Sequence, residues 1–113
     1  MDFTLASSDL GRVAISESAV AQMVGLTAAE SYGVVGMATG KLGRLRPRAN
    51  RGIEVSGNGE GLSIALHVVV EHGLNLAEVA STVRNRVAYE VGRMTGLPIA
   101  SVEVHIEAVK ASA

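Results

Sequence analysis

The chain of 113 residues contains no cysteine and no tryptophan, and it has only two tyrosines and one phenylalanine. The absence of cysteine excludes disulfide frameworks, thiolate metal sites and cysteine nucleophiles. The scarcity of aromatic rings argues against a platform for single-stranded nucleic acid, because bases stack on exposed aromatic faces. The core must therefore consist of Val, Ile, Leu, Ala and Met side chains.

Strong charge of one sign and long apolar runs are also missing. The formal net charge is −1, so no global basic field attracts nucleic acid or a membrane surface. The longest apolar run centres on residues 68–70 and is far too short to span a bilayer. Residues 1–6 lack the basic and apolar regions of a signal peptide. We therefore expect no direct membrane span, and any attachment would need a partner or the protein surface.

What is present is typical of one globular domain, with 48% hydrophobic and 19% charged residues. Residues 1–10 are mixed and predict a flexible lead-in. A short strand is expected at 11–15. Ser16 is then a candidate N-cap for a helix over 17–31, and the segment 34–38 reads as a second short strand.

The second half has clearer periodicity. A strand starts at Ile53, and Asn58 with Gly59 is expected to make the turn at positive φ. The return strand alternates strictly, with one apolar face made by Leu62, Ile64, Leu66, Val68 and Val70. Asn75 can cap a helix that Gly96 and Pro98 end, and a last strand alternates over residues 101–107.

These elements predict an α+β fold in the order strand–helix–strand–strand–strand–helix–strand. Each strand and helix has one apolar face, so we expect a small mixed or antiparallel sheet with two helices packed on one face. The domain would cover residues 11–109, and residues 110–113 would form a tail.

One segment stands apart in charge. Residues 39–51 contain half of the ten basic residues and no acid, and the glycines and Pro47 oppose regular structure. The basic residues could bind phosphate groups of nucleic acid or lipid through forked donors, and they are Lys41, Arg44, Arg46, Arg48 and Arg51. Because one loop supplies at most five such contacts, nucleic acid is the less favoured ligand. The other interpretation is a solvated linker between two strands.

The less apolar face of the sheet offers two further hypotheses. If the two long strands are neighbours, His67 and His105 approach each other, with Glu103 or Glu107 alongside. Such a group could bind a metal or move a proton, or it could simply decorate a half-exposed face. A moderately apolar sheet face also favours a second copy, and the predicted self-association face consists of Ala65, His67, Val69 and His105.

No catalytic pattern accompanies these residues. The carboxylates are scattered, and the Gly-x-Ser-x-Gly nucleophile pattern is absent. The glycine run at residues 57–61 precedes a strand rather than a helix, so it predicts a hairpin turn and not a phosphate loop. We therefore predict no catalytic site, no cofactor and no resident metal.

Four motifs in order resemble the alkaline shock protein family, also called Gls-type general stress or envelope stress response proteins. Residues 11–20 read Gly-Arg-Val-Ala-Ile-Ser-Glu-Ser-Ala-Val, and residues 32–37 read Tyr-Gly-Val-Val-Gly-Met. Residues 67–76 read His-Val-Val-Val-Glu-His-Gly-Leu-Asn-Leu, and residues 94–98 read Met-Thr-Gly-Leu-Pro before the last strand. The resemblance covers residues 11–109.

The resemblance implies a non-enzymatic, cytoplasmic bacterial protein of cell-envelope homeostasis and stress. It also implies self-assembly and, for some members, tethering at the inner face of the membrane through a small partner protein. The family brings no catalytic residues to carry over. This chain departs from it in the arginine-rich segment, so the resemblance assigns no role to those arginines.

Overall fold

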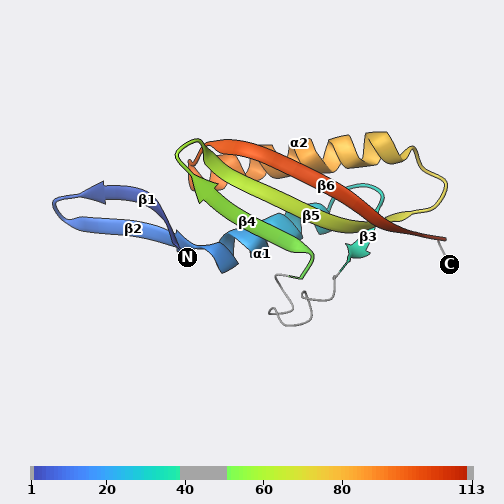
Figure 1. Ribbon diagram of the computed structural model, residues 1–113, viewed down its shortest axis with the longest axis horizontal. Coiled ribbons are helices and arrows are strands. Elements are labelled where there is room, and N and C mark those ends of the chain that lie inside the picture. The colour runs from blue at the N-terminus through green and yellow to red at the C-terminus, as the bar shows by residue number, and fades with distance from the viewer. Residues whose placement is uncertain (1, 39–50, 112–113) are drawn as a thin grey trace.

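The computed structural model describes residues 2–38 and 51–111. The described elements follow the chain as β1 (Asp2–Ser8), β2 (Gly11–Ser16), α1 (Glu17–Ala29), β3 (Val34–Met37), β4 (Ile53–Asn58), β5 (Gly61–Glu71), α2 (Leu76–Thr95) and β6 (Ile99–Lys110). Figure 1 shows an elongated body with β5 at its centre and the β1–β2 hairpin projecting from one end. The predicted α+β class and element order are confirmed, with β1 as an additional strand.

The main sheet is organised around β5, which is paired on both edges. On one edge β4 pairs antiparallel with its first half and β3 pairs antiparallel with its second half. On the other edge β6 runs parallel to β5 over almost the whole strand. The sheet is therefore mixed, one of the two forms that the sequence predicted.

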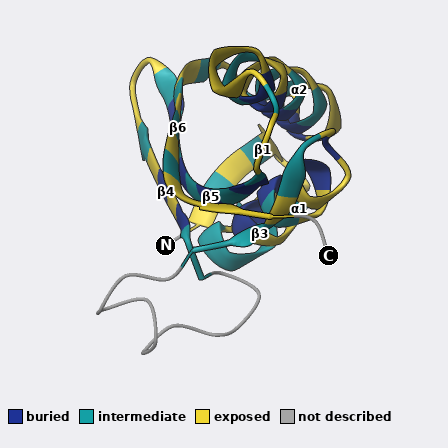
Figure 2. Ribbon diagram, turned by 90° about the vertical axis from the view of Figure 1, so that its right-hand side faces the viewer, coloured by how far each residue is buried: buried dark blue, intermediate teal, exposed yellow. Residues whose placement is uncertain are grey.

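Both helices pack on the same face of this sheet. Helix α1 contacts β3 and β4, α2 contacts β6, and the helices contact each other. Figure 2 shows the buried residues concentrated between the helices and the sheet. Four valines spaced by four residues give α2 its buried stripe, and they are Val79, Val83, Val87 and Val91.

The predicted helix ends are confirmed. The Ser16 hydroxyl accepts a hydrogen bond from the Ala19 amide at 3.0 Å, and the Asn75 Oδ1 accepts one from the Glu78 amide at 3.1 Å. Gly96 ends α2 in the left-handed conformation at φ 72°. These caps satisfy amides and a carbonyl that the helices would otherwise leave unpaired, so local residues define where the helices sit on the sheet.

The amino-terminal segment differs from the expected flexible lead-in. Strand β1 pairs antiparallel with β2, from Asp2 opposite Ser16 to Ser8 opposite Gly11. The Phe3 ring holds the base of this hairpin against Gly57, where an added Cβ would lie 2.7 Å from Phe3 Cε1. Because the hairpin is exposed on both faces, its sequence lacks the alternation that marks a half-buried strand. At the other end β6 includes Lys110, which the sequence had assigned to the tail.

The turn between β4 and β5 also differs from its prediction. No described residue other than glycine has positive φ, and in this turn the positive φ lies at Gly61, not at Asn58 or Gly59. The Asn58 Oδ1 instead accepts a hydrogen bond from the Glu60 amide at 2.7 Å. The two-residue connection is therefore closed by an Asn side chain and followed by a left-handed glycine.

Candidate interaction surface on the open sheet face

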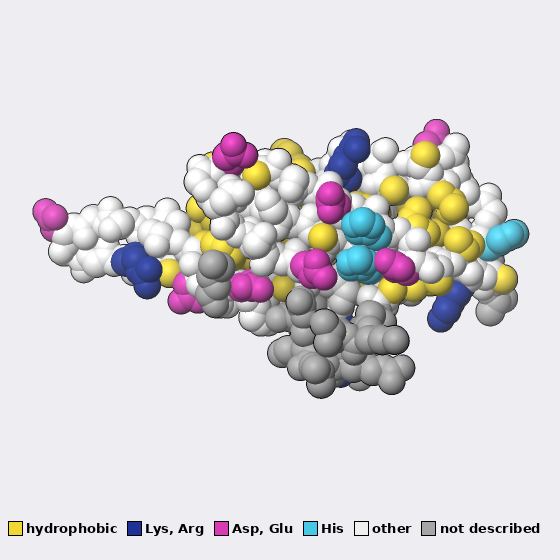
Figure 3. All heavy atoms as spheres, in the orientation of Figure 1, with side chains coloured by type: hydrophobic (Ala, Val, Ile, Leu, Met, Phe, Trp, Pro, Cys, Tyr) yellow, Lys and Arg dark blue, Asp and Glu magenta, His cyan; other side chains and the backbone are white. Residues whose placement is uncertain are grey.

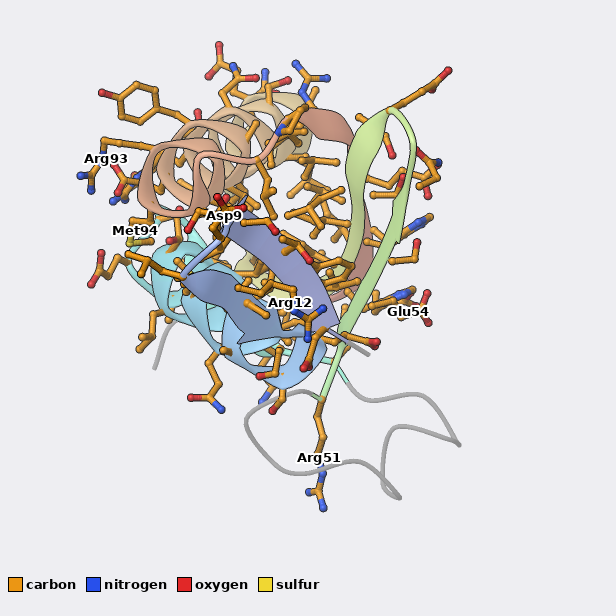
Figure 4. All side chains as sticks on the ribbon, turned by 90° about the vertical axis from the view of Figure 1, so that its left-hand side faces the viewer. Asp9, Arg12, Arg51, Glu54, Arg93 and Met94 are labelled. Atoms are coloured by element: carbon orange, nitrogen blue, oxygen red, sulfur yellow. The ribbon has the colours of Figure 1, made fainter. Side chains whose placement is uncertain are left out.

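The face of the sheet opposite the helices, here called the open face, carries the predicted self-association residues. It presents Ala65, His67 and Val69 from β5 and His105 from β6, all partly or largely exposed. Figure 3 shows this side of the molecule, with two adjacent histidines flanked by acidic side chains. Glu54 of β4 points away from the helices on the same side (Figure 4). The described part of the chain places no second layer over this face.

His67 and His105 form a stacked pair at the centre of the open face. They are direct partners in the β5–β6 register, and their rings lie 4.9 Å apart at an interplanar angle of 13°. The predicted approach of the two histidines is thus confirmed. The parallel pairing explains it, because it places residues of equal parity on the same face of both strands.

Each histidine has a carboxylate beside it. His67 Nδ1 lies 2.7 Å from Glu107 Oε1, and His105 Nε2 lies 3.6 Å from Glu103 Oε2. Exposed fractions of 28% for His67 and 48% for Glu107 leave this short contact partly open to water. A neutral His67 that donates from Nδ1 to Glu107 keeps an acceptor at Nε2, so the pair presents both donors and acceptors to a partner.

A bulge in β6 brings Glu107 to His67. Val68 faces Ile106 and Val69 faces Ala108 in the register, so Glu107 is an extra residue without a direct partner on β5. Bulges of this kind redirect a side chain and bend the strand locally. Sequence reasoning placed Glu107 near the histidines but missed the bulge, since no residue type in residues 105–108 marks it.

The described residues contain no group of three or more His, Asp or Glu side chains arranged to hold a metal ion. The hypothetical set of His67, His105 and Glu103 is brought together only in part, because His67 faces Glu107 while His105 faces Glu103. What the arrangement offers is a set of hydrogen-bonding groups on a flat, partly apolar sheet face.

Most of the predicted anion-binding residues fall outside the described residues. These are Lys41, Arg44, Arg46 and Arg48. Arg51 is described and half-buried, and it directly precedes Gly52. The residues that bracket the segment both bond to the backbone of His67, which accepts from the Ala38 amide at 2.9 Å and donates to the Gly52 carbonyl at 2.8 Å. The basic segment therefore leaves and rejoins the sheet on the β3–β4 edge, level with the histidine pair.

The fold and the surface define a class first: a two-layer α+β domain whose sheet is covered by helices on one face and open on the other. The chain belongs to the alkaline shock protein 23 family, whose model carries a cell envelope-related function and matches residues 6–111. The family resemblance expected from the four motifs is thus confirmed. No described helix is both long and apolar enough to cross a membrane.

Relatives of similar length support this assignment. The chain is 32% identical over 107 residues to the uncharacterized protein YloU of Bacillus subtilis, covering 88% of this chain and 89% of YloU. It is 28% identical over 107 residues to the uncharacterized protein Spy1614 of Streptococcus pyogenes, covering 88% of each chain. These similarities extend over nearly the whole domain, including the strands that build the open face.

Solved structures show the same fold at lower identity. A variant of the MamM CTD superposes with a TM-score of 0.51 at 16% identity, covering 84% of this chain and 94% of that one. A second MamM CTD variant superposes with a TM-score of 0.50 at 17% identity, covering 84% and 85%. At this identity the likeness concerns the fold alone.

Proposed function

We propose that the protein is a non-enzymatic structural and interaction protein of the bacterial envelope stress response, which acts by self-association and partner docking through the open face. The observation that carries the proposal is the uncovered sheet face, where Ala65 and Val69 lie beside a stacked histidine pair. The family's cell envelope-related function gives the biological setting.

The physical argument concerns what an uncovered sheet face gains from a partner. Ala65 and Val69 are partly exposed, so contact with a second surface removes further apolar area from water, at about 25 cal/mol per Å². The histidines and their carboxylates add hydrogen bonds that orient the partner rather than drive association. A second copy and a small membrane-anchored protein are the two docking partners that we propose, and the latter would hold the protein at the inner face of the cell membrane.

The test uses the full chain in sedimentation velocity over a range from micromolar to hundreds of micromolar. We expect a reversible oligomer, and Val69→Lys should weaken its association at least tenfold because a charge would be buried at the contact. Thr82→Lys, on the exposed part of α2, is the matched control with the same new charge and should associate like the parent. A parent protein that is monomeric throughout, or a control that fails equally, would refute self-association through this face.

A second candidate function, binding to anionic phosphate groups, is favoured by the distribution of charge. Residues 41–51 carry five of the ten basic residues and none of the eleven acidic ones, so a charge of +5 opposes −6 in the rest of the chain. The described acidic residues include Glu54, Glu103 and Glu107 on the open face, so the two ends of the charge distribution lie on the same sheet. Arginine forks suit phosphates of lipid head groups or of nucleic acid.

This alternative is tested by replacing the segment's four arginines with alanine. Binding of the parent to vesicles with anionic lipid, and separately to duplex DNA, is measured at several salt concentrations. The alternative requires binding that weakens steeply with salt and is lost in the variant, since released counterions dominate such contacts. Absence of binding by the parent, or equal binding by the variant, would exclude it.

A further inference from the structure

The outer edge of β6 is the long unpaired strand edge of the main sheet. Strand β6 has 12 residues, and within the described chain only β5 pairs with it, along the other edge. An unpaired edge exposes a row of backbone donors and acceptors that another strand can use. Two bulges, at Ala100 and at Glu107, interrupt its register with β5, so residues 101–106 are the regular stretch.

A groove of about 350 Å³ opens along this edge. Its lining from β6 includes Val102 and Val104, which face the helices, together with Glu103 and His105 from the open face. Side chains from both faces of one strand can line the same hollow only where the strand edge is accessible. On the other side of the groove lie Ala80, Ser81 and Arg84 of α2.

We infer that residues 102–106 of β6 pair antiparallel with the same residues of a second copy, about a two-fold axis at Val104. In this register Glu103 lies opposite His105 of the second copy, and His105 lies opposite Glu103. Val102 lies opposite Ile106 on the helix side, and Val104 lies opposite itself. An axis perpendicular to the sheet makes the strands antiparallel and keeps both open faces on the same side of one continuous sheet.

Charge selects this register from its neighbours. Moving the axis to Glu103 puts Glu103 opposite its own copy, and moving it to His105 puts Glu103 opposite Glu107. Directly opposed like charges destabilise antiparallel pairs, while opposite charges and apolar pairs stabilise them. A shift by one residue would turn the apolar face of one strand against the polar face of the other. Of these registers, only the one centred on Val104 makes every facing pair complementary.

This inference rests on the proposed self-association and specifies how a second copy binds at the edge of the open face. Because the chain has no cysteine, single cysteines report the register directly. Directly opposite Cβ atoms lie about 4.5–5.5 Å apart, close enough for a disulfide after small adjustment. We expect Val104→Cys to form a covalent dimer with oxidised glutathione, since that position faces itself.

Two further variants separate pairing from random collision. Val102→Cys and Ile106→Cys should each give little dimer alone, but their mixture should give the heterodimer, because residue 102 faces residue 106. Leu26→Cys, on an exposed position of α1 with 68% exposure, measures collisional crosslinking. Equal crosslinking by all four single variants, or a stronger homodimer at residue 102 than at residue 104, would overturn the register.

A charge exchange provides an independent measurement. His105→Glu alone places two carboxylates opposite each other twice, and we expect dimer dissociation to rise at least tenfold. Adding Glu103→His restores complementary pairs in the same register, and association should return towards the parent value. If the parent self-associates but neither the crosslinks nor the exchange follow this pattern, the β6 pairing is wrong and the proposed function stands. A monomeric parent would remove both.

Discussion

The two faces of β5 have different roles, although their residues alternate along one strand. The inward set is buried to within 2% exposure, and it consists of Leu62, Ile64, Leu66, Val68 and Val70. The outward set is half-buried throughout, and it consists of Ser63, Ala65, His67, Val69 and Glu71. The inward set packs against the helices, whereas the outward set meets no second layer in the described chain.

The difference teaches where this fold has freedom to vary. A slip of one residue would exchange the two sets, so the inward side chains enforce the register. Once the register is set, the outward positions contribute little to the core and can change to suit a partner. We therefore expect substitutions on the inner face to alter stability, and substitutions on the open face to alter association.

Leu66→Ala should have the largest effect on stability. Leu66 is 0% exposed at the centre of the core, so truncation loses apolar contacts and leaves a cavity. We expect the free energy of unfolding to fall by about 2–5 kcal/mol, measured by urea denaturation.

Ser63→Ala is the matched control on the opposite face of the same strand. It should change the free energy of unfolding by less than about 0.5 kcal/mol. Comparable losses in the two variants would mean that the open face is as tightly packed as the core, and the comparison between the faces would collapse.

The inner face could be predicted from sequence because its signal is local. Alternation over residues 62–71 identified the buried side chains, and Ser16 and Asn75 identified the helix starts. These features depend on neighbours within a few residues. The histidine pair was predicted in the same way, on the assumption that β5 and β6 are adjacent.

The features that the sequence did not reveal depend on distant parts of the chain. The β1–β2 hairpin is held by Phe3 against Gly57, a contact across more than fifty residues. The free edge of β6 follows from which strands pair with β5, and periodicity carries no information on pairing order. Nor does any local pattern mark the bulge that brings Glu107 to His67.

Gly61→Ala should have an intermediate effect that belongs to neither face. Gly61 has φ 123°, and an added Cβ would lie 2.3 Å from the Pro98 carbonyl oxygen, which accepts a hydrogen bond from the Leu62 amide. Because backbone atoms cannot move aside easily, we expect a loss of about 1–3 kcal/mol in thermal or urea unfolding.

Gly59→Ala tests whether the loss at Gly61 comes from this close approach. No heavy atom lies within 4 Å of an added Cβ at Gly59, so its stability should be unchanged or slightly higher. If Gly59→Ala were the more harmful of the two, the positive φ of this turn would be at Gly59, as the Asn-Gly pattern first suggested.

The smallest expected effect concerns the contact between His67 and Glu107 on the open face. Both side chains are partly exposed, so water screens their interaction, and their coupling should be about 0.2–1 kcal/mol. The measurement is a double-mutant cycle of His67→Ala and Glu107→Ala in urea unfolding. Coupling of several kcal/mol would show that the open face stabilises the fold as the core does. Small coupling, together with weaker self-association of the single variants, would place the role of these residues in partner binding.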